Sequence, residues 1–382
     1  VVIEDQPLLA EDKVLYYGQP IALVAAETQE AVDEALEKIE VEYEPLTPLL
    51  DPLKSMNSSI KIFEENNVFA HHKIRKGDID KGFKEADVIL ESTYRTPYQE
   101  HAYLEPQGSI AIPLPNGFME LRSTCQCPFY IHEAVHVILG LQRSKIRVIQ
   151  TETGGAFGGK EDVPSIVAGQ ASLLAYLAKR PVKLIYTREE DIISMSKRHP
   201  SWVKMKSGVT KDGKLVATEV KYILDSGAYA TLSPIVLWRG NIHSCGAYVI
   251  PNVKVDCYAV ATNKVPCGAY RGFGSPQILF AVERHIDELA KKINMDPAEL
   301  RRRNILRDGD RTVTDQLLDH SVGLEECLDK VLEASQWEKK IKEYPKKEGN
   351  EIRGIGLSTI YYGCGLGAGG AFLARTGSYV QV

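Results

Sequence analysis

Residues 146–177 read IRVIQTETGGAFGGKEDVPSIVAGQASLLAYL, and this stretch predicts a strand, a glycine-rich loop and a helix in direct succession. We expect the strand at residues 145–150, the loop at 154–159 and the helix at 163–177. Glycines let backbone N–H groups approach a ligand closely, and a helix begins with N–H groups that have no intrahelical partner. The stretch therefore predicts a binding loop, with an anionic group favoured at the start of the helix.

A second glycine-containing stretch, AYRGFGSPQ at residues 269–277, repeats this arrangement. Ser275 is suited to cap the helix that follows, and Pro276 fits the first helical position. This helix is expected to end near residue 293. The sequence DPAE at 296–299 has the signature of another helix start.

The rest of the chain mixes strands and helices without strict strand–helix–strand alternation, so we expect an α+β fold. At the N-terminal end, a helix at residues 29–39, capped by Thr28, lies between expected strands at 20–26 and 40–43 and forms a βαβ-like unit. Residues 51–72 and 338–353 are expected to be linkers. Further predicted elements are a helix at 130–141 and strands at 88–94, 109–112, 118–123, 182–187, 203–209, 215–225 and 354–362, with a hairpin turn at Lys211-Asp212-Gly213.

Length and composition exclude several classes of protein. The 382 residues allow about two or three domains. A net charge of −5 argues against a nucleic-acid partner, and no apolar run reaches the ~18 residues of a membrane helix. Seven cysteines, an odd number, favour a reducing compartment, so the cytoplasm is expected. The first residue is not Met, and the last residues alternate like a strand, which suggests part of a longer polypeptide.

Four segments stand out because they pair a tight or glycine-containing backbone with a polar side chain. They lie at residues 123–126, 154–161, 238–239 and 269–277. Arg239 and Arg271 can grip a planar or anionic ligand through fork-like hydrogen bonds. Glu161 offers a carboxylate, and Phe273 offers an apolar face. Together they predict a pocket for an anionic cofactor and a flat, polar substrate.

Two short motifs suggest other chemistry. His132, Glu133 and His136 fit H-E-x-x-H, in which two histidines on one helix face bind zinc and the glutamate acts as base. A third ligand would have to be Glu152 or Glu161. Residues 154–160 fit the G-x-x-x-x-G-K phosphate loop, but Glu161 stands where that motif needs Ser or Thr.

Seven ordered segments extend the evidence from motifs to a family. They are YYGQPIALVAAET (16–28), HAYLEPQG (101–108), GGAFGGKE (154–161), KRHP (197–200), DSGAYA (225–230), YVIPNV (248–253) and AYRGFGSPQ (269–277). In this order they resemble the molybdenum-binding portion of the xanthine dehydrogenase/aldehyde oxidase family of molybdenum hydroxylases. The resemblance implies the end of a hammerhead α/β domain at 1–60, a first molybdopterin-binding domain at 61–340 and the start of a second at 341–382.

The resemblance also implies cofactors and partners. The cofactor is molybdopterin, with the cytosine dinucleotide form as one option, and its dithiolene holds molybdenum without any side-chain ligand. Iron–sulfur clusters and FAD would lie on partner subunits or on missing parts of the protein, together with the remaining molybdopterin-binding portion. The family's catalytic glutamate belongs to a GEPP-like motif that this sequence does not contain. A small-molecule substrate, no nucleic acid and no membrane complete the expected partners.

The family's functional positions can be placed on this sequence. The resemblance assigns cofactor contacts to Gln126, Gly155, Phe157, Gly158, Ala269, Tyr270 and Arg271, catalytic roles to Gln126, Glu161, Arg239 and Arg271, and substrate contacts to Glu161, Arg239 and Phe273. The pair Glu161 and Arg239 resembles the purine-type arrangement. It implies oxidation of xanthine or hypoxanthine, with water as the oxygen source and electrons passed to iron–sulfur and flavin partners. Alternatives are an aldehyde or another N-heterocycle in the same family, or zinc-dependent hydrolysis.

Overall fold

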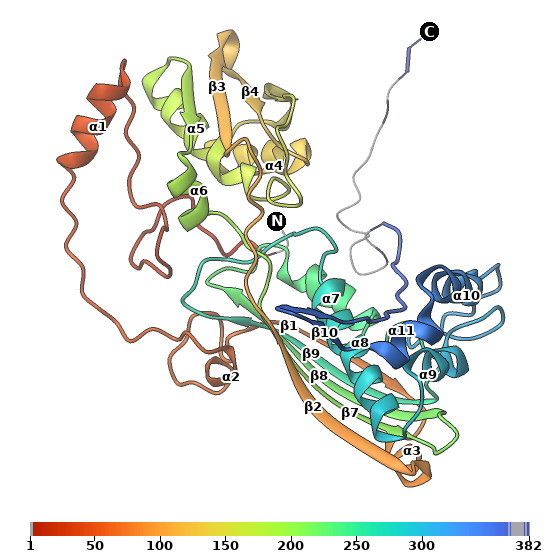
Figure 1. The fold of residues 1–382 in the computed structure, drawn as a ribbon. Coiled ribbons are helices and arrows are strands. Elements are labelled where there is room, and N and C mark those ends of the chain that lie inside the picture. The colour runs from red at the N-terminus through yellow and green to blue at the C-terminus, as the bar shows by residue number, and fades with distance from the viewer. Residues whose placement is uncertain (1–2, 366, 368–377, 379, 382) are drawn as a thin grey trace.

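Two open sheets carry the fold (Figure 1). The structure is a computed structural model that describes residues 3–365, 367, 378 and 380–381. Both sheets are mostly antiparallel, with one parallel pair each, and helices are interspersed between the strands. The predicted α+β class is therefore confirmed. Part of the expected domain at 341–382 lies outside the described residues.

The larger sheet has five strands in the order β1-β9-β8-β7-β2. The predicted hairpin of residues 203–209 and 215–225 is confirmed as the antiparallel pair β7 and β8. Alternate side chains along these strands, among them Val203, Val220 and Tyr222, are fully buried and form the main core with helices α7 and α8. The elements are β1 (Val68–Lys76), β2 (Val88–Thr96), β7 (Ser201–Val209), β8 (Leu215–Gly227), β9 (Asn252–Ala261), α7 (Ser233–Ile242) and α8 (Ser275–Lys292).

The smaller sheet has four strands in the order β5-β4-β3-β6 and is covered by α4 and α5. The strand, loop and helix predicted between residues 145 and 177 are confirmed as β5, a glycine-rich turn and α5. Fully buried Leu121, Ile131 and Ala171 form part of its core. The elements are β3 (Gly108–Leu114), β4 (Phe118–Ser123), β5 (Ile146–Gln150), β6 (Val182–Ile185), α4 (Pro128–Leu139) and α5 (Pro164–Ala178).

Shorter elements surround the two sheets. The predicted helix start at Asp296 is confirmed, because its side chain accepts the Ala298 N–H at 2.7 Å and caps α9. These elements are α1 (Gln29–Glu37), α2 (Pro52–Ser55), α3 (Ile79–Glu85), η1 (Pro115–Gly117), η2 (Arg143–Lys145), α6 (Arg188–Ser194), α9 (Pro297–Asn304), α10 (Leu324–Ser335), α11 (Trp337–Glu343), β10 (Lys346–Glu348) and β11 (Glu351–Arg353). Across the described part of the chain, helices lack the length and apolar character needed to cross a bilayer.

The predicted βαβ-like unit at the N-terminal end is wrong in its strands. Helix α1 forms and Thr28 caps it, but residues 20–26 and 40–43 are not strands. A strand needs a neighbouring strand for its backbone hydrogen bonds, and among the described residues neither segment joins a ladder. Pro20 O accepts a single bond, from Ala10 N at 2.8 Å. Val41 and Tyr43 of the second segment are exposed to solvent, whereas Ile21, Leu23 and Val24 of the first segment are partly buried.

Three further expectations are corrected. Residues 51–72, expected to be a linker, contain α2 and the first part of β1, whose backbone pairs with β9 despite its polar sequence. Residues 338–353, also expected to be a linker, contain most of α11 and the β10–β11 hairpin. Residues 354–362 are not a strand, because single hydrogen bonds, such as that from Thr359 N to Glu283 at 2.9 Å, anchor them in place of a ladder.

Two connections join the sheets. The first runs from β2 to β3 across residues 97–107, and the second runs from β6 to β7 through α6 and residues 195–200 (Figure 1). They touch each other where Gln99 and Arg198 form an isolated bridge. The second connection also touches the chain after β9, because Lys197 bridges Cys267. The glycine-containing loop at 269–274 therefore begins where both connections meet.

Candidate functional site

A cavity of about 300 Å³ lies between the two glycine-containing loops. One wall comes from the smaller sheet, through the end of β4 and the turn between β5 and α5. The other comes from the larger sheet, through the loop between β9 and α8. The lining residues are Gln126, Phe157, Gly158, Glu161, Ala269, Tyr270, Arg271, Gly272 and Phe273.

Gln126 organises the first loop. Its side-chain oxygen accepts the N–H groups of Gly158 at 3.0 Å and Lys160 at 3.4 Å, while its backbone N–H donates to Lys160 O at 2.6 Å. The oxygen is thus committed to the loop, and the amide NH₂ is the part that can donate toward the pocket. Phe157 is half exposed and adopts a left-handed backbone, with φ of 55°. Such backbone strain concentrates at binding sites.

The two loops touch through their backbones. Arg271 N donates to Phe157 O at 2.9 Å. Gly158 has φ of 102°, and a Cβ atom there would lie 2.8 Å from both the carbonyl carbon and oxygen of Ala269. Only glycine fits this position, and the contact fixes the spacing of the pocket walls.

Two residues that line the pocket have unused backbone donors. Within the described residues, the backbone N–H groups of Ala269 and Gly272 have no hydrogen-bond acceptor. Helices α5 and α8, which follow the two loops, both begin without a side-chain cap. Free N–H groups and helix starts attract negative charge. The free N–H groups of the second loop can therefore hydrogen-bond an anionic group in the pocket.

Glu161 supplies the carboxyl group of the pocket. Burial raises its pKa to about 7, and the neighbouring charge of Asp162 adds to the rise. Near neutral pH the carboxyl group is therefore present in both protonation states, so it can either donate or accept a hydrogen bond. Phe273, held at φ of 49°, provides an apolar surface in the same pocket.

A polar network that the motif analysis did not assign supports the first loop from behind. Glu105 accepts hydrogen bonds at 2.7 Å from Gly154 N, Thr124 Oγ1 and the fully buried ammonium of Lys160. Because Lys160 is held in this way, it cannot reach a nucleotide as a phosphate-loop lysine does. Glu105 belongs to the HAYLEPQG stretch, and the family resemblance of that stretch was the one feature of the sequence that could have indicated its role.

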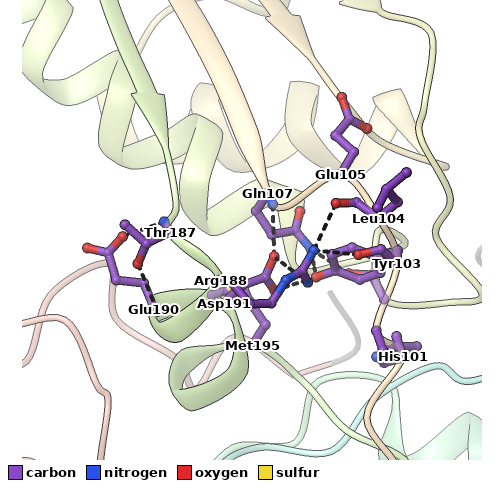
Figure 2. Close-up of polar contacts among 12 residues, drawn as sticks. His101, Tyr103, Leu104, Glu105, Gln107, Thr187, Arg188, Glu190, Asp191 and Met195 are labelled. Atoms are coloured by element: carbon purple, nitrogen blue, oxygen red, sulfur yellow. Dashed lines mark hydrogen bonds and ion pairs between the residues drawn. The ribbon is translucent and has the colours of Figure 1, made fainter.

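Asp191 of α6 extends this support (Figure 2). The Tyr103 hydroxyl donates to Asp191 at 2.5 Å, and Gln107 donates to the same hydroxyl at 2.8 Å and to Gly159 O at 2.7 Å. Arg188 donates to the carbonyls of Tyr103 and Leu104. Side chains of the first connection and α6 thereby fix the back of the loop.

Two predicted site residues are placed elsewhere. Gly155 lies in the first loop but does not line the cavity. Arg239, on α7, is buried and does not line it either. Its guanidinium donates to the carbonyls of Gly363, at 2.6 Å, and Gly365, and lies 5.0 Å from the Tyr362 ring centre. The predicted pairing of Arg239 with Glu161 is not formed here.

The H-E-x-x-H residues have other partners. His132 and His136 hydrogen-bond the carbonyls of Arg143 and Leu141, and Glu133 forms an ion pair with Arg143. Among residues with a described position, no cluster of three or more His, Cys, Asp or Glu side chains is arranged to hold a metal ion. The motif belongs to the junction of α4 and η2, and the geometry does not favour the zinc hypothesis.

Comparison with known proteins places these loops in a family. Residues 62–305 match the family described as "Molybdopterin cofactor-binding domain", and residues 1–47 match "Aldehyde oxidase and xanthine dehydrogenase, a/b hammerhead domain". Over 87% of its length, the chain is 40% identical to the nicotinate dehydrogenase large molybdopterin subunit of Eubacterium barkeri. Over 97%, it is 37% identical to a probable xanthine dehydrogenase subunit of Bacillus subtilis.

A solved structure agrees. The aldehyde oxidoreductase from Desulfovibrio gigas superposes with a TM-score of 0.81 over 89% of this chain, at 31% identity. The chain spans 78% of the Eubacterium protein, 49% of the Bacillus protein and 38% of the Desulfovibrio chain. By these matches and by the pocket between its two loops, the chain belongs to the xanthine dehydrogenase/aldehyde oxidase family of molybdenum hydroxylases and contains its molybdopterin-binding domain.

Proposed function

We propose that this chain is the molybdopterin-binding part of an oxidoreductase that hydroxylates an N-heterocycle, with the purines xanthine and hypoxanthine as first candidates. One observation carries the proposal. The carboxyl group of Glu161, with a pKa of about 7, lines the same cavity as both glycine-containing loops. Ring N–H groups and ring nitrogens of a heterocycle need a partner that can accept and donate, and Glu161 can do both.

The residues present fit an anionic pterin cofactor. Its binding would use the NH₂ group of Gln126, the backbone at Phe157 and Gly158, and the free N–H groups of Ala269 and Gly272. The chemistry that molybdopterin supplies when bound is hydroxylation with water as the oxygen source and removal of two electrons. This chain's own residues would bind and orient the cofactor, because the contact between the two loops holds them at a fixed spacing.

The substrate would lie against Phe273 with its ring edge toward Glu161. An aromatic face stabilises a flat heterocycle by stacking, and the half-buried carboxyl group selects ring nitrogens by hydrogen bonding. We propose that Arg239 joins this pocket only when its bonds to Gly363 and Gly365 are exchanged for a bond to substrate. An aldehyde is the second candidate, because the arrangement seen leaves Glu161 without that cation.

Electron acceptors would lie on other polypeptides or domains. We propose an iron–sulfur protein and an FAD protein as partners, together with the rest of the molybdopterin-binding portion, in the cytoplasm. The Eubacterium and Bacillus relatives are both named as subunits, which supports an assembly of this kind. The cytosine dinucleotide form of the cofactor remains part of the proposal.

The test is Glu161→Gln in the complete, partner-bound enzyme. The amide keeps the size of the side chain with one acceptor and one donor end, but it carries no charge and cannot gain or lose a proton to match the ring nitrogen that faces it. We expect kcat/KM for xanthine to fall by about 10²-fold or more, the effect of losing a buried polar contact to substrate. Oxidation of benzaldehyde, which has no ring nitrogen, should change by less than about threefold.

Glu152→Gln is the matched control, since Glu152 is an exposed carboxylate in the segment just before the same loop. It should leave both reactions unchanged. Equal losses for xanthine and benzaldehyde in Glu161→Gln would contradict a role in choosing heterocycles. A wild-type enzyme that oxidises benzaldehyde but neither purines nor nicotinate would overturn the substrate class.

A further inference from the structure

Tyr270 of the second loop packs against two buried side chains, an imidazole and a guanidinium, that the family resemblance does not assign to the pocket. The His101 ring stacks on it with centroids 4.5 Å apart and an angle of 26° between the planes. The Arg198 guanidinium carbon lies 3.8 Å from the same ring centre. Both groups therefore pack directly against the one ring.

The same two side chains hold the backbone on either side of Tyr270. His101 Nε2 lies 2.8 Å from Ala269 O, and Arg198 donates to Arg271 O at 2.9 Å. Since a carbonyl only accepts, His101 carries its proton on Nε2. Each clamping group therefore fixes the ring and an adjacent carbonyl at once.

Both clamping groups are buried, which makes these contacts strong. His101 and Arg198 are 6% and 7% exposed. Within the described residues, Nε and Nη1 of Arg198 have no hydrogen-bond partner, so the Tyr270 ring is a main neighbour of this charge. Desolvation strengthens a cation–π contact such as the one between Arg198 and Tyr270. Burial lowers the pKa of His101 to about 4, so its ring stays neutral near pH 7.

The clamp joins the two inter-sheet connections. His101 lies on the connection from β2 to β3 and Arg198 on the one from β6 to β7, which meet at the Gln99–Arg198 bridge. Neither residue lines the cavity. They contact Ala269, Tyr270 and Arg271, and these three residues do line the cavity.

We propose that His101 and Arg198 are positioning residues, which clamp Tyr270 and thereby hold the 269–273 wall of the pocket at the distance and orientation that turnover requires. Displacement of about 1 Å in a reacting group can cost about 10²-fold in rate. The clamp would thus act on kcat through the loop, without touching substrate. The inference rests on the proposed function only in that the pocket must turn over some substrate.

The test is Arg198→Met in the complete enzyme, because methionine keeps a long side chain but removes the charge and the donors. We expect kcat to fall about 10- to 100-fold with KM changed less than threefold. Hydrogen exchange of the amides in residues 268–274 should become at least tenfold faster. Molybdenum content should stay close to wild type, Tm should fall by only a few degrees, and Arg198→Lys should recover part of kcat.

Arg95→Met is the matched control, because Arg95 lies 5.8 Å from the Trp202 ring on the larger sheet, away from the loop. It should change none of these quantities. Unchanged exchange at 268–274, or a parallel loss of molybdenum, Tm and activity, would overturn the positioning role. If Arg198→Met does not fold, His101→Gln serves instead, with the same expected exchange and kcat results and the same contrary outcomes.

Kinetics are measured with xanthine and with benzaldehyde. If the wild type turns over benzaldehyde and not xanthine, the proposed substrate class fails, while the clamp is still tested on benzaldehyde. If xanthine is turned over and the variants behave like wild type, the clamp fails and the proposed function stands.

Discussion

Glu161 is the single carboxyl group among the nine residues that line the pocket. Its raised pKa has a consequence for stability that can be measured without substrate. The folded-state pKa is about 7, against an ordinary value near 4.5, with burial as the main cause. Between these values the folded chain keeps a proton that the unfolded chain has lost, so stability falls as the pH rises, and it is level again above about pH 7.

Glu161→Gln removes this titration. We expect the variant to gain stability relative to wild type as the pH rises from 5 to 8, by at most about 3 kcal/mol. The measurement is Tm by differential scanning fluorimetry at half-unit pH steps, with Glu152→Gln as the control for loss of an exposed carboxylate. A Tm difference between Glu161→Gln and wild type that stays constant over this range would mean that Glu161 titrates normally.

At the scale of elements, the contact between the loops depends on one missing side chain. Gly158→Ala places a Cβ atom 2.8 Å from the Ala269 carbonyl in a left-handed backbone. The two loops must separate to admit it. We expect loss of molybdenum from the purified enzyme together with destabilisation by several kcal/mol, the sum of backbone strain and a clash with main-chain atoms.

Gly140→Ala provides the matched control. Gly140 also has a left-handed backbone, with φ of 64°, but an added Cβ would meet nothing within 4 Å. It should cost about 1 kcal/mol and retain molybdenum. Molybdenum content by mass spectrometry and Tm distinguish an effect of backbone strain from an effect of the contact between the loops. If both variants lose the same amount of molybdenum and of Tm, the loop contact has no special role.

The sequence predicts elements well where local signals suffice. The strand–loop–helix at 145–177 and the cap at Asp296 depend on neighbouring residues, and both are confirmed. Strand β1 was missed because FAHHKIRK is polar, and its pairing with β9 is decided by residues nearly 200 positions away. Residues 20–26 are apolar enough for a strand but pair with no strand in the described chain.

At the candidate site, the sequence motifs predict the residues that line the pocket but not the residues that hold them in place. Eight predicted site residues meet in one cavity, because they lie in two compact loops: Gln126, Phe157, Gly158, Glu161, Ala269, Tyr270, Arg271 and Phe273. The clamping role of His101 and Arg198 could not be predicted, because it depends on where two connections cross. The position of Arg239 depends on contacts with residues 363 and 365, which no local pattern indicates.

At the scale of the whole molecule, a buried ion-pair network ties distant parts together. Arg301 of α9 is fully buried and donates to Glu283 and Asp287 of α8. Glu283 also accepts from Tyr248 and from Thr359 N. The network therefore joins two helices to the chain that follows β11.

Removing the Arg301 side chain should leave these carboxylates without their positively charged partner. We expect Arg301→Met to lower the free energy of unfolding by about 3–5 kcal/mol, since it leaves the buried Glu283 carboxylate without its counter-charge. Arg303→Met on the same helix breaks a half-exposed pair with Glu299 and should cost less than about 1 kcal/mol. Denaturant unfolding of both variants provides the comparison, and similar losses would show that the buried network is not selectively stabilising.

The two walls of the pocket come from segments that lie far apart along the chain, and this separation determines when the pocket can form during folding. Position 126 and positions 157–161 come from the smaller sheet, and positions 269–273 come from the larger one, more than 100 residues further along the chain. Such distant segments meet late, because closing the intervening chain is entropically costly. A receptor for the pterin thus exists only once both sheets have formed and docked. Cofactor loading would then act as quality control, since misfolded or half-made chains have nothing with which to retain it.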